Sequence, residues 1–421
     1  MLISNKNYIL SLLLKTWEKD IDGIFDYGSN SFKEKEAFIN ESFYIVRTKN
    51  DLIKKIYQHS DIQTKLGDDL LFKVNNCKND IFSLMNPIPK KLNLTEENTK
   101  YLNNKLWYIV KSDFEDNDYN NQDYLLNEND IIKLGSLKFA VQEIHKEYNI
   151  NFKNESEPPI PILNYDIYNL NRNLPPVFDF IFEVKHYYNK NLIDNNKSAN
   201  EYDNSNNINI IKCTICSKAE INDDDFLNPL ISLCQCEQLV HYKCLKQKIS
   251  ETKIIKNEED NNCVKTIIIN EFDCEICKTQ FPLRFKLPDS NKVFYLINIK
   301  RPINCDYIIL ESLDCKKDNR FIKTIHIISL LKEYINIGRD SDNDIIELDC
   351  SISRKHSVIK YIKDNKNIIL ENRSKNYGTL VLIRKPINIL EQKICLQIGR
   401  PYVEAKLMKM KEFEKLKLDN I

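Results

Sequence analysis

The chain has 421 residues, with 61 Lys and Arg against 61 Asp and Glu and a formal net charge of +0 at pH 7. This length favours a protein of several domains, and the balanced charge disfavours a protein that binds nucleic acid or anionic lipid through its overall field. No apolar run is long enough to cross a bilayer, and no cleavable signal sequence opens the chain. We therefore expect a soluble cytoplasmic or nuclear protein.

Residues 1–147 are expected to form a mixed α/β region. Up to about residue 90 we expect helix and loop, because the first apolar residues fall at helical spacing. These residues are Ile9, Leu12, Leu13 and Trp17. From Trp107 the sequence is rich in β-forming residues, and the alternation around Gly135 predicts a β-hairpin over residues 131–143.

Residues 148–208 are rich in Pro and Asn, which predicts a linker with one strand near Phe178–Val184. The next segment, residues 209–286, contains cysteines and a histidine in four closely spaced pairs. The pairs are Cys213 and Cys216, Cys234 and Cys236, His241 and Cys244, and Cys274 and Cys277. Eight such ligands predict two structural Zn²⁺ ions, since thiolate and imidazole are the donors that zinc prefers. Closed sites with four protein ligands have no open position for hydrolytic chemistry.

The segments Cys213-Thr-Ile-Cys216, Val240-His-Tyr-Lys-Cys-Leu245 and Cys274-Glu-Ile-Cys277 resemble the RING-CH (RING-variant) family, whose ligand order is C4HC3. The resemblance implies a cross-brace. Cys213, Cys216, His241 and Cys244 would hold one zinc, and Cys234, Cys236, Cys274 and Cys277 the other. Most members are ubiquitin ligases that dock a ubiquitin-conjugating enzyme, and Ile215 matches one contact for that enzyme.

Two features keep other interpretations of the finger open. Lys248 stands where the RING-CH family has a Trp, which removes a large apolar contact for the conjugating enzyme. PHD fingers share the C4HC3 order and would imply a chromatin reader, although Phe272 stands where they usually have Trp. The finger is therefore expected to be a folded two-zinc platform with or without ligase activity.

Residues 291–409 are rich in short strands, which predicts a β-sandwich. The predicted strands are Phe294–Ile299, Tyr307–Leu310, Ile325–Leu330, Tyr334–Ile337, Val358–Ile362, Ile368–Leu370, Thr379–Ile383 and Ile394–Ile398. A Lys-rich tail follows at residues 410–421, and the pattern from Lys406 to Leu418 is helical.

Three polar motifs lie at strand ends of this sandwich. They are Ile337-Gly338-Arg339, then Ser351-Ile-Ser353-Arg-Lys-His356, then Asn372-Arg-Ser-Lys-Asn-Tyr-Gly378-Thr379. A guanidinium is a planar fork with a permanent charge that suits phosphate oxygens, and a serine hydroxyl with a second cation can complete the site.

In order and spacing these motifs resemble the FHA domain, a phosphothreonine-peptide-binding family. The resemblance implies that the ligand contacts come from Arg339, Ser353, Arg354, Asn376 and Thr379. It gives Gly338, His356 and Gly378 structural roles. The sequence departs from the family at Tyr377, because the Asn that normally precedes the glycine is one place earlier, at Asn376.

The sequence also contains an internal echo. Ile131-Ile-Lys-Leu-Gly135 is similar to Cys395-Leu-Gln-Ile-Gly399, and both resemble the closing hairpin of a sandwich. This favours a second, degenerate FHA-like sandwich in the N-terminal region, although generic hairpins share the pattern.

The preferred hypothesis is a signalling adaptor that binds a phosphothreonine-containing protein and carries a two-zinc finger. The alternative is a ubiquitin ligase whose FHA domain selects the substrate.

Overall fold

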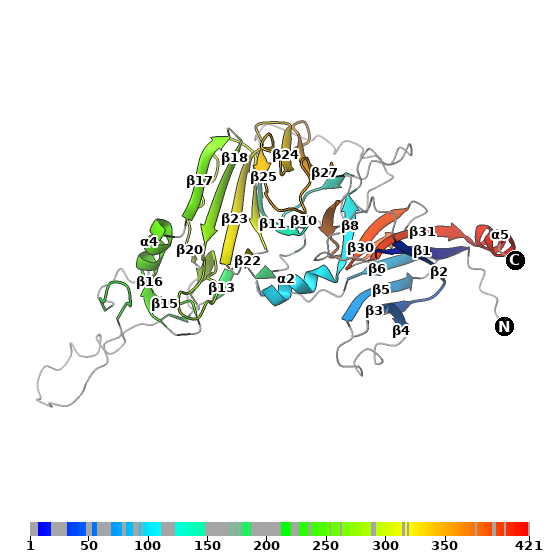
Figure 1. Cartoon of the computed structure of the whole chain (residues 1–421), viewed down its shortest axis with the longest axis horizontal. Helices are drawn as coiled ribbons and strands as arrows, with labels where there is room; N and C mark the ends of the chain where they lie inside the picture. Colours follow the sequence, from blue (N-terminus) through cyan, green and yellow to red (C-terminus); the bar gives the residue numbers. More distant parts are fainter. Residues whose placement is uncertain are drawn as a thin grey trace, which may run out of the picture.

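A computed structural model of the chain shows a mainly β protein (Figure 1). In the described part its helices are α2 (Glu96–Asn103), α4 (Tyr242–Thr252) and α5 (Met410–Asp419). None of them is long and apolar enough to span a membrane. The structure describes residues 7–17, 32–47, 53–56, 69–77, 81–86, 92–93, 96–110, 123–147, 170, 174, 178–179, 181–183, 185–186, 212–219, 227–234, 236, 238–252, 254–261, 263–287, 292–313, 316–317, 320–374, 377–389, 393–399 and 401–419.

One 13-stranded sheet runs through the whole molecule, and one strand, β22 (Lys316–Lys317), pairs with it off the main path. Across the sheet the other strands are β17 (Ile254–Asn261), β18 (Val264–Asn270), β23 (Arg320–Ser329), β21 (Tyr307–Ser312), β11 (Leu137–His145), β10 (Ile131–Leu134), β28 (Thr379–Leu382), β8 (Leu106–Val110), β30 (Ile394–Ile398), β31 (Pro401–Lys409), β1 (Tyr8–Trp17) and β2 (Phe32–Ile39).

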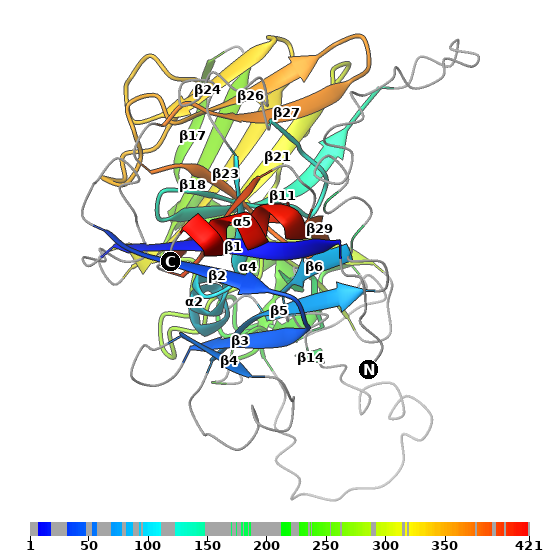
Figure 2. The same cartoon turned by 90° about the vertical axis from the view of Figure 1, so that its right-hand side faces the viewer.

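Two five-stranded sheets face this long sheet. The first has the order β25 (Ile345–Ile346), β24 (Tyr334–Gly338), β26 (Ser357–Ile362), β27 (Asn367–Asn372) and β9 (Tyr124–Leu125). The second has the order β29 (Ile387–Ile389), β6 (Ile81–Met85), β5 (Asp69–Cys77), β3 (Phe43–Arg47) and β4 (Ile53–Ile56). Figure 2 shows the first of them, with β24, β26 and β27, lying over β21 and β23. The layers are compatible with β-sandwiches.

Three smaller sheets complete the described pairing. Their orders are β14 (Lys185–His186), β15 (Leu230–Ser232) and β16 (Val240–His241); β13 (Ile181–Glu183), β19 (Arg284–Lys286) and β20 (Val293–Tyr295); and β12 (Phe178–Asp179) with β7 (Leu92–Asn93).

The central strands of the long sheet are apolar on both faces, because both faces are covered. In β21, Ile308 and Leu310 enter the core under the five-stranded sheet, whereas Tyr307 and Ile309 enter a second core under the finger. This alternation follows from the two-residue period of a strand. In β8, Trp107 is buried on the face of the sheet that carries helix α2, where it packs in a third core with Leu102 of that helix.

The strand order of the C-terminal half is repeated in the N-terminal half. The C-terminal half has two layers. One layer has the strand order β23, β21, β11, β10 and β28, and the layer that faces it has the order β25, β24, β26, β27 and β9. The N-terminal half repeats this arrangement. One layer has the strand order β2, β1, β31, β30 and β8, and the layer that faces it has the order β4, β3, β5, β6 and β29. We call these two-layer units the C-terminal and the N-terminal sandwich.

The two sandwiches exchange their last three strands. The C-terminal sandwich takes β9, β10 and β11 from residues 124–145, and the N-terminal sandwich takes β29, β30 and β31 from residues 387–409. The two halves are joined where β28 pairs with β8 antiparallel, with Thr379 opposite Val110 and Leu382 opposite Trp107. Each half therefore depends on the other for its closing strands.

The two similar segments of the internal echo form the corresponding hairpins of the two sandwiches. The first is β10 and β11 with Gly135 in the turn, and the second is β30 and β31 with Gly399. Both glycines have φ of 56°, a left-handed conformation in which glycine carries no Cβ penalty.

The finger is joined to the C-terminal sandwich through the stretch between its third and fourth ligand pairs. This stretch forms the hairpin β17 and β18, and β18 pairs with β23 from Val264 opposite Ile328 to Asn270 opposite Ile322. The finger thus extends the same sheet. The predicted boundaries at residues 147, 208, 286 and 409 stay predictions, and the sheets combine segments from both sides of the first three.

The helix predicted from Ile9, Leu12, Leu13 and Trp17 is wrong, because these residues lie in β1 between β2 and β31. Consecutive residues here, Ile9 to Leu12, are all buried, so the segment is buried on both faces and not amphipathic. In the described residues before position 90 strands replace the expected helices. The C-terminal helix begins only at Met410, since residues 401–409 complete β31.

Candidate functional site

The three predicted motifs of the C-terminal sandwich come together at one end of its smaller sheet. Strand β24 ends at Gly338, and the next residue, Arg339, donates its backbone N–H to the carbonyl of Ser353 at 3.0 Å. Asp340 donates in the same way to Arg354 at 3.2 Å. These two bonds hold the Arg339 segment against the loop that carries Ser353 and Arg354.

Gly338 is required by the close approach of these two segments. A Cβ atom at this position would lie closer than 3.0 Å to the carbonyl oxygen of Arg354. The same carbonyl accepts a hydrogen bond from Nδ2 of Asn343 at 2.8 Å. Asn343 is buried and also donates to the carbonyl of Asp340. Sequence reasoning missed Asn343, because it lies in a polar loop without any motif.

His356 is fully buried and links the loop that carries Ser353 and Arg354 to the turn at Gly378. Its Nδ1 accepts from the backbone N–H of Ser353 at 3.1 Å, and its Nε2 lies 3.1 Å from the carbonyl of Gly378. Because a carbonyl only accepts, we assign the proton to Nε2. Burial lowers the pKa of His356 to about 4, so the ring is neutral at pH 7 and both of its bonds are formed.

A chain of hydrogen bonds leads from the turn to the Ser353 hydroxyl. Tyr377 donates its backbone N–H to Oγ of Ser374 at 3.1 Å, and Oγ of Ser374 lies 2.7 Å from Oγ of Ser353. Asn372 holds this turn, since its Oδ1 accepts from the backbone N–H of Ser374 and from the hydroxyl of Thr379. The third sequence motif already contained Asn372 and Ser374, but the sequence assigned a role to neither of them.

The structure places the predicted ligand contacts in three different situations. Arg339 and Arg354 are exposed, and neither guanidinium is paired with any side chain in the described part of the chain. Ser353 is half-buried beside them. Thr379 is fully buried, with its hydroxyl also 2.6 Å from that of Ser357. Asn376 lies outside the described residues.

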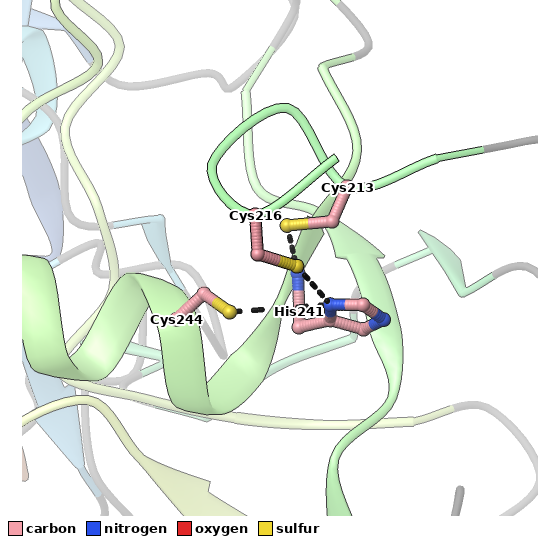
Figure 3. Close-up of side chains that lie close together, drawn as sticks. All are labelled: Cys213, Cys216, His241 and Cys244. Atoms are coloured by element: carbon pink, nitrogen blue, oxygen red, sulfur yellow. Dashed lines mark hydrogen bonds between the residues drawn. The ribbon is translucent and has the colours of Figure 1, made fainter. Parts of the chain in front are cut away.

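The second constellation is the pair of cysteine and histidine clusters. Cys213, Cys216, His241 and Cys244 form one cluster, and Cys234, Cys236, Cys274 and Cys277 form the other, with the candidate ligand atoms of each within 4.8 Å of one another. The structure therefore brings together the same two sets of four that the cross-brace implies. Figure 3 shows the thiols of Cys216 and Cys244 directed at the His241 ring, and Cys216 Sγ lies 3.3 Å from its Nδ1.

The two Cys-x-Ile-Cys segments have the same backbone geometry. In the first, Ser217 donates to the carbonyl of Cys213 at 2.8 Å and has φ of 59°. In the second, Lys278 donates to the carbonyl of Cys274 at 2.9 Å and has φ of 56°. Each turn presents its two thiols on one side, which suits half of a tetrahedral site.

The chemistry of these groups fits a divalent metal ion. Burial raises the pKa of Cys244 to about 12, and burial next to other thiols raises the pKa of Cys234 as well. Thiolate is the form that binds metal, and a bound cation offsets this cost. In the described residues, two Cys/His clusters can thus hold metal ions.

A cavity of about 250 Å³ lies between the two Cys-x-Ile-Cys turns and helix α4. Ile215 and Ile276, which occupy the same place in the two turns, line it and are 41% and 64% exposed. Lys248 on α4 lines it too and forms an ion pair of 3.0 Å with Glu275. An apolar rim with a charged pair is thus open to solvent.

Comparison with protein families agrees with the geometry of the first site. The family model of the FHA domain matches residues 335–399, so the chain carries an FHA domain there. The match extends through β29 and β30, which lie in the N-terminal sandwich, because the strand exchange leaves the order of strands along the sequence unchanged. Neither the curated proteins nor the solved structures contain a match to the chain.

Proposed function

We propose that this protein is a signalling adaptor that binds phosphothreonine peptides at Arg339, Ser353 and Arg354. The observation that carries the proposal is the exposed, unpaired Arg339, which a backbone bond of 3.0 Å holds beside Ser353 in the FHA domain. An FHA domain indicates phosphopeptide binding in signalling, and the exposed guanidinium groups of Arg339 and Arg354 can supply charge-assisted hydrogen bonds to phosphate oxygens.

The buried hydrogen bonds prepare the Ser353 hydroxyl for a phosphate oxygen. Tyr377 N–H occupies a lone pair of the Ser374 oxygen, so Ser374 can direct its own proton to Ser353 Oγ at 2.7 Å. The proton of Ser353 is then free for the ligand. In this proposal Ser374, Asn372, His356 and Gly378 support the loop, and the buried Thr379 supports the turn.

A separate contact is proposed between the turn before Gly378 and the backbone of the bound peptide. By resemblance to the FHA family, Asn376 would hold the backbone of the ligand beside Tyr377. Tyr377 is half-buried, and its backbone N–H is already used by Ser374. We assign the peptide-backbone contact to Asn376 and the phosphate contacts to Arg339, Ser353 and Arg354.

For the finger, we propose that the metal is Zn²⁺, one ion in each cluster, and that its role is structural. The donor sets support this, since three thiolates with one imidazole and four thiolates are common zinc ligand sets. In a small segment the metal supplies much of the folding free energy, about 10–16 kcal/mol per ion in isolated fingers.

Phosphopeptide binding is tested by changing Arg339 to Ala. Loss of a charge-assisted contact of about 1.5–3 kcal/mol should weaken binding about 10- to 150-fold. The measurement is fluorescence anisotropy with peptides selected from a phosphothreonine library, each compared with its unphosphorylated form. Lys363→Ala removes the same charge from an exposed turn beyond the far end of β26 and should change the affinity by less than about twofold. Equal binding of phosphorylated and unphosphorylated peptides by the wild type would contradict the proposal.

The metal content tests the finger. Release of bound metal from the intact chain, followed with a zinc-sensitive dye and by elemental analysis, should give two equivalents of zinc. Cys213→Ser should remove one equivalent and Cys274→Ser the other, because each takes one thiolate from a different cluster. Cys350→Ser changes an exposed cysteine outside both clusters and should leave two. A metal-free wild type would overturn the assignment.

A second candidate function, ubiquitin ligation, is favoured by one observation, the cavity with its exposed Ile215 and Ile276 rim. By resemblance to RING-CH fingers, Ile215 would contact a ubiquitin-conjugating enzyme. Lys248 departs from that family, yet it also lines the cavity, and a lysine can cover apolar surface with its aliphatic chain.

The ligase candidate predicts autoubiquitination by the zinc-loaded chain with at least one member of a panel of conjugating enzymes. Ile215→Ala should lower the rate about 30-fold, since loss of a central apolar contact costs about 2 kcal/mol. The control is Ile303→Ala, which removes an apolar side chain that is 84% exposed outside the finger. If the folded wild type shows no autoubiquitination with any enzyme of the panel, this candidate function is excluded.

A further inference from the structure

The loop that carries Ser353 and Arg354 rests on a turn that belongs to a distant part of the sequence. This turn is Gly135-Ser136, between β10 and β11, and it is one of the elements exchanged between the sandwiches. Ser136 donates its backbone N–H to Oγ of Ser351 at 2.8 Å, across 215 positions of sequence. The two hydroxyl oxygens of Ser136 and Ser351 lie 3.1 Å apart. The turn therefore contacts the loop two residues before Ser353.

The approach of the two segments is close enough to require glycine. A Cβ atom on Gly135 would lie closer than 3.0 Å to both the carbonyl oxygen and Oγ of Ser351. Gly135 also has φ of 56°, a conformation in which other residues are strained. The obstacle includes backbone of the loop, so a larger residue here would have to move the loop itself.

Ser351 is well placed to pass such a movement to the phosphate contacts. It is only 2% exposed, and its hydroxyl is 2.5 Å from Oδ1 of Asp349, which also accepts from its backbone N–H. The next residue, Ile352, is 1% exposed in the sandwich core. Packed segments do not deform continuously, so a shift at Ser351 is carried to Ser353.

We propose that the Gly135-Ser136 turn is a positioning element of the phosphopeptide site, which therefore depends on residues from two distant parts of the sequence. This inference rests on the proposed function and adds a requirement for residues 123–147. Peptide binding and docking of the β10–β11 hairpin are then coupled reciprocally. A ligand that needs the aligned loop stabilises the docked hairpin, and the docked hairpin increases the affinity for the ligand.

The chain contains its own matched control. Gly399 occupies the equivalent turn, between β30 and β31 of the N-terminal sandwich, and has the same φ of 56°. Alanine at either position meets the same backbone strain. Gly135 meets Ser351 in the loop of Ser353, whereas Gly399 lies in the turn of the other sandwich.

The experiment compares the full-length wild type, Gly135→Ala and Gly399→Ala by two measurements. The first is the affinity for a phosphothreonine peptide selected on the wild type. The second is hydrogen exchange of residues 349–356 in the absence of peptide. Gly135→Ala should weaken binding about tenfold or more and accelerate exchange in this segment, whereas Gly399→Ala should change the affinity by less than about twofold. Ser351→Ala, which removes the shared hydroxyl without adding volume, should act in the same direction.

A double-mutant cycle of Gly135→Ala with Ser353→Ala separates positioning from general destabilisation. If the turn acts through the loop that carries Ser353, the double variant loses less binding free energy than the sum of the losses in the two single variants. Equal effects of the two glycine variants on both measurements, or strictly additive losses, would overturn the proposal. If the wild type binds no phosphothreonine peptide, the proposed function fails, and hydrogen exchange alone decides whether the turn braces residues 349–356.

Discussion

The pairing of the β10–β11 hairpin with β28 and β21 is the contact on which the C-terminal sandwich depends. Without it, β28 and β21 would each have an unpaired edge in the middle of the long sheet, and unpaired buried backbone groups are costly. The same hairpin places Gly135 and Ser136 under the loop of Ser353. One element from the N-terminal third therefore closes the sheet and supports the candidate ligand site.

The finger is held to this arrangement by the sheet and by buried polar contacts. The β18 strand adds to β23, and Thr266 on it bonds Nδ1 of His326, whose Nε2 lies 2.9 Å from Glu347. Glu347 in turn donates its backbone N–H to the carbonyl of Gly338 at 3.0 Å. A continuous set of contacts thus runs from the finger to the start of the Arg339 segment. A partner on the finger and a peptide on the FHA domain would be held in a defined relation.

The parts of the site that were predictable from sequence are those carried by neighbouring residues. The four Cys and His pairs and the Gly338-Arg339 and Ser353-to-His356 motifs are local in sequence, so the pairs were recognisable from their spacing and the motifs from their resemblance to the FHA family. The strand exchange was not predictable, because the hairpins with Gly135 and Gly399 in their turns have similar sequences and either would fit either sandwich. The support from Gly135 was missed for the same reason. The strand β1 was mistaken for a helix because burial on both faces removes the periodicity that separates the two.

The β10–β11 hairpin contacts the loop that carries Ser353 and Arg354 within one chain, and an engineered disulfide tests this contact most directly. The hydroxyl oxygens of Ser136 and Ser351 are 3.1 Å apart, so cysteines at both positions should be close enough to bridge. After mild oxidation of Ser136→Cys/Ser351→Cys protein, peptide mapping of the monomer should find the two segments linked, and neither single variant should give this link. Absence of the link in the monomer, or its presence only between two chains, would contradict the account.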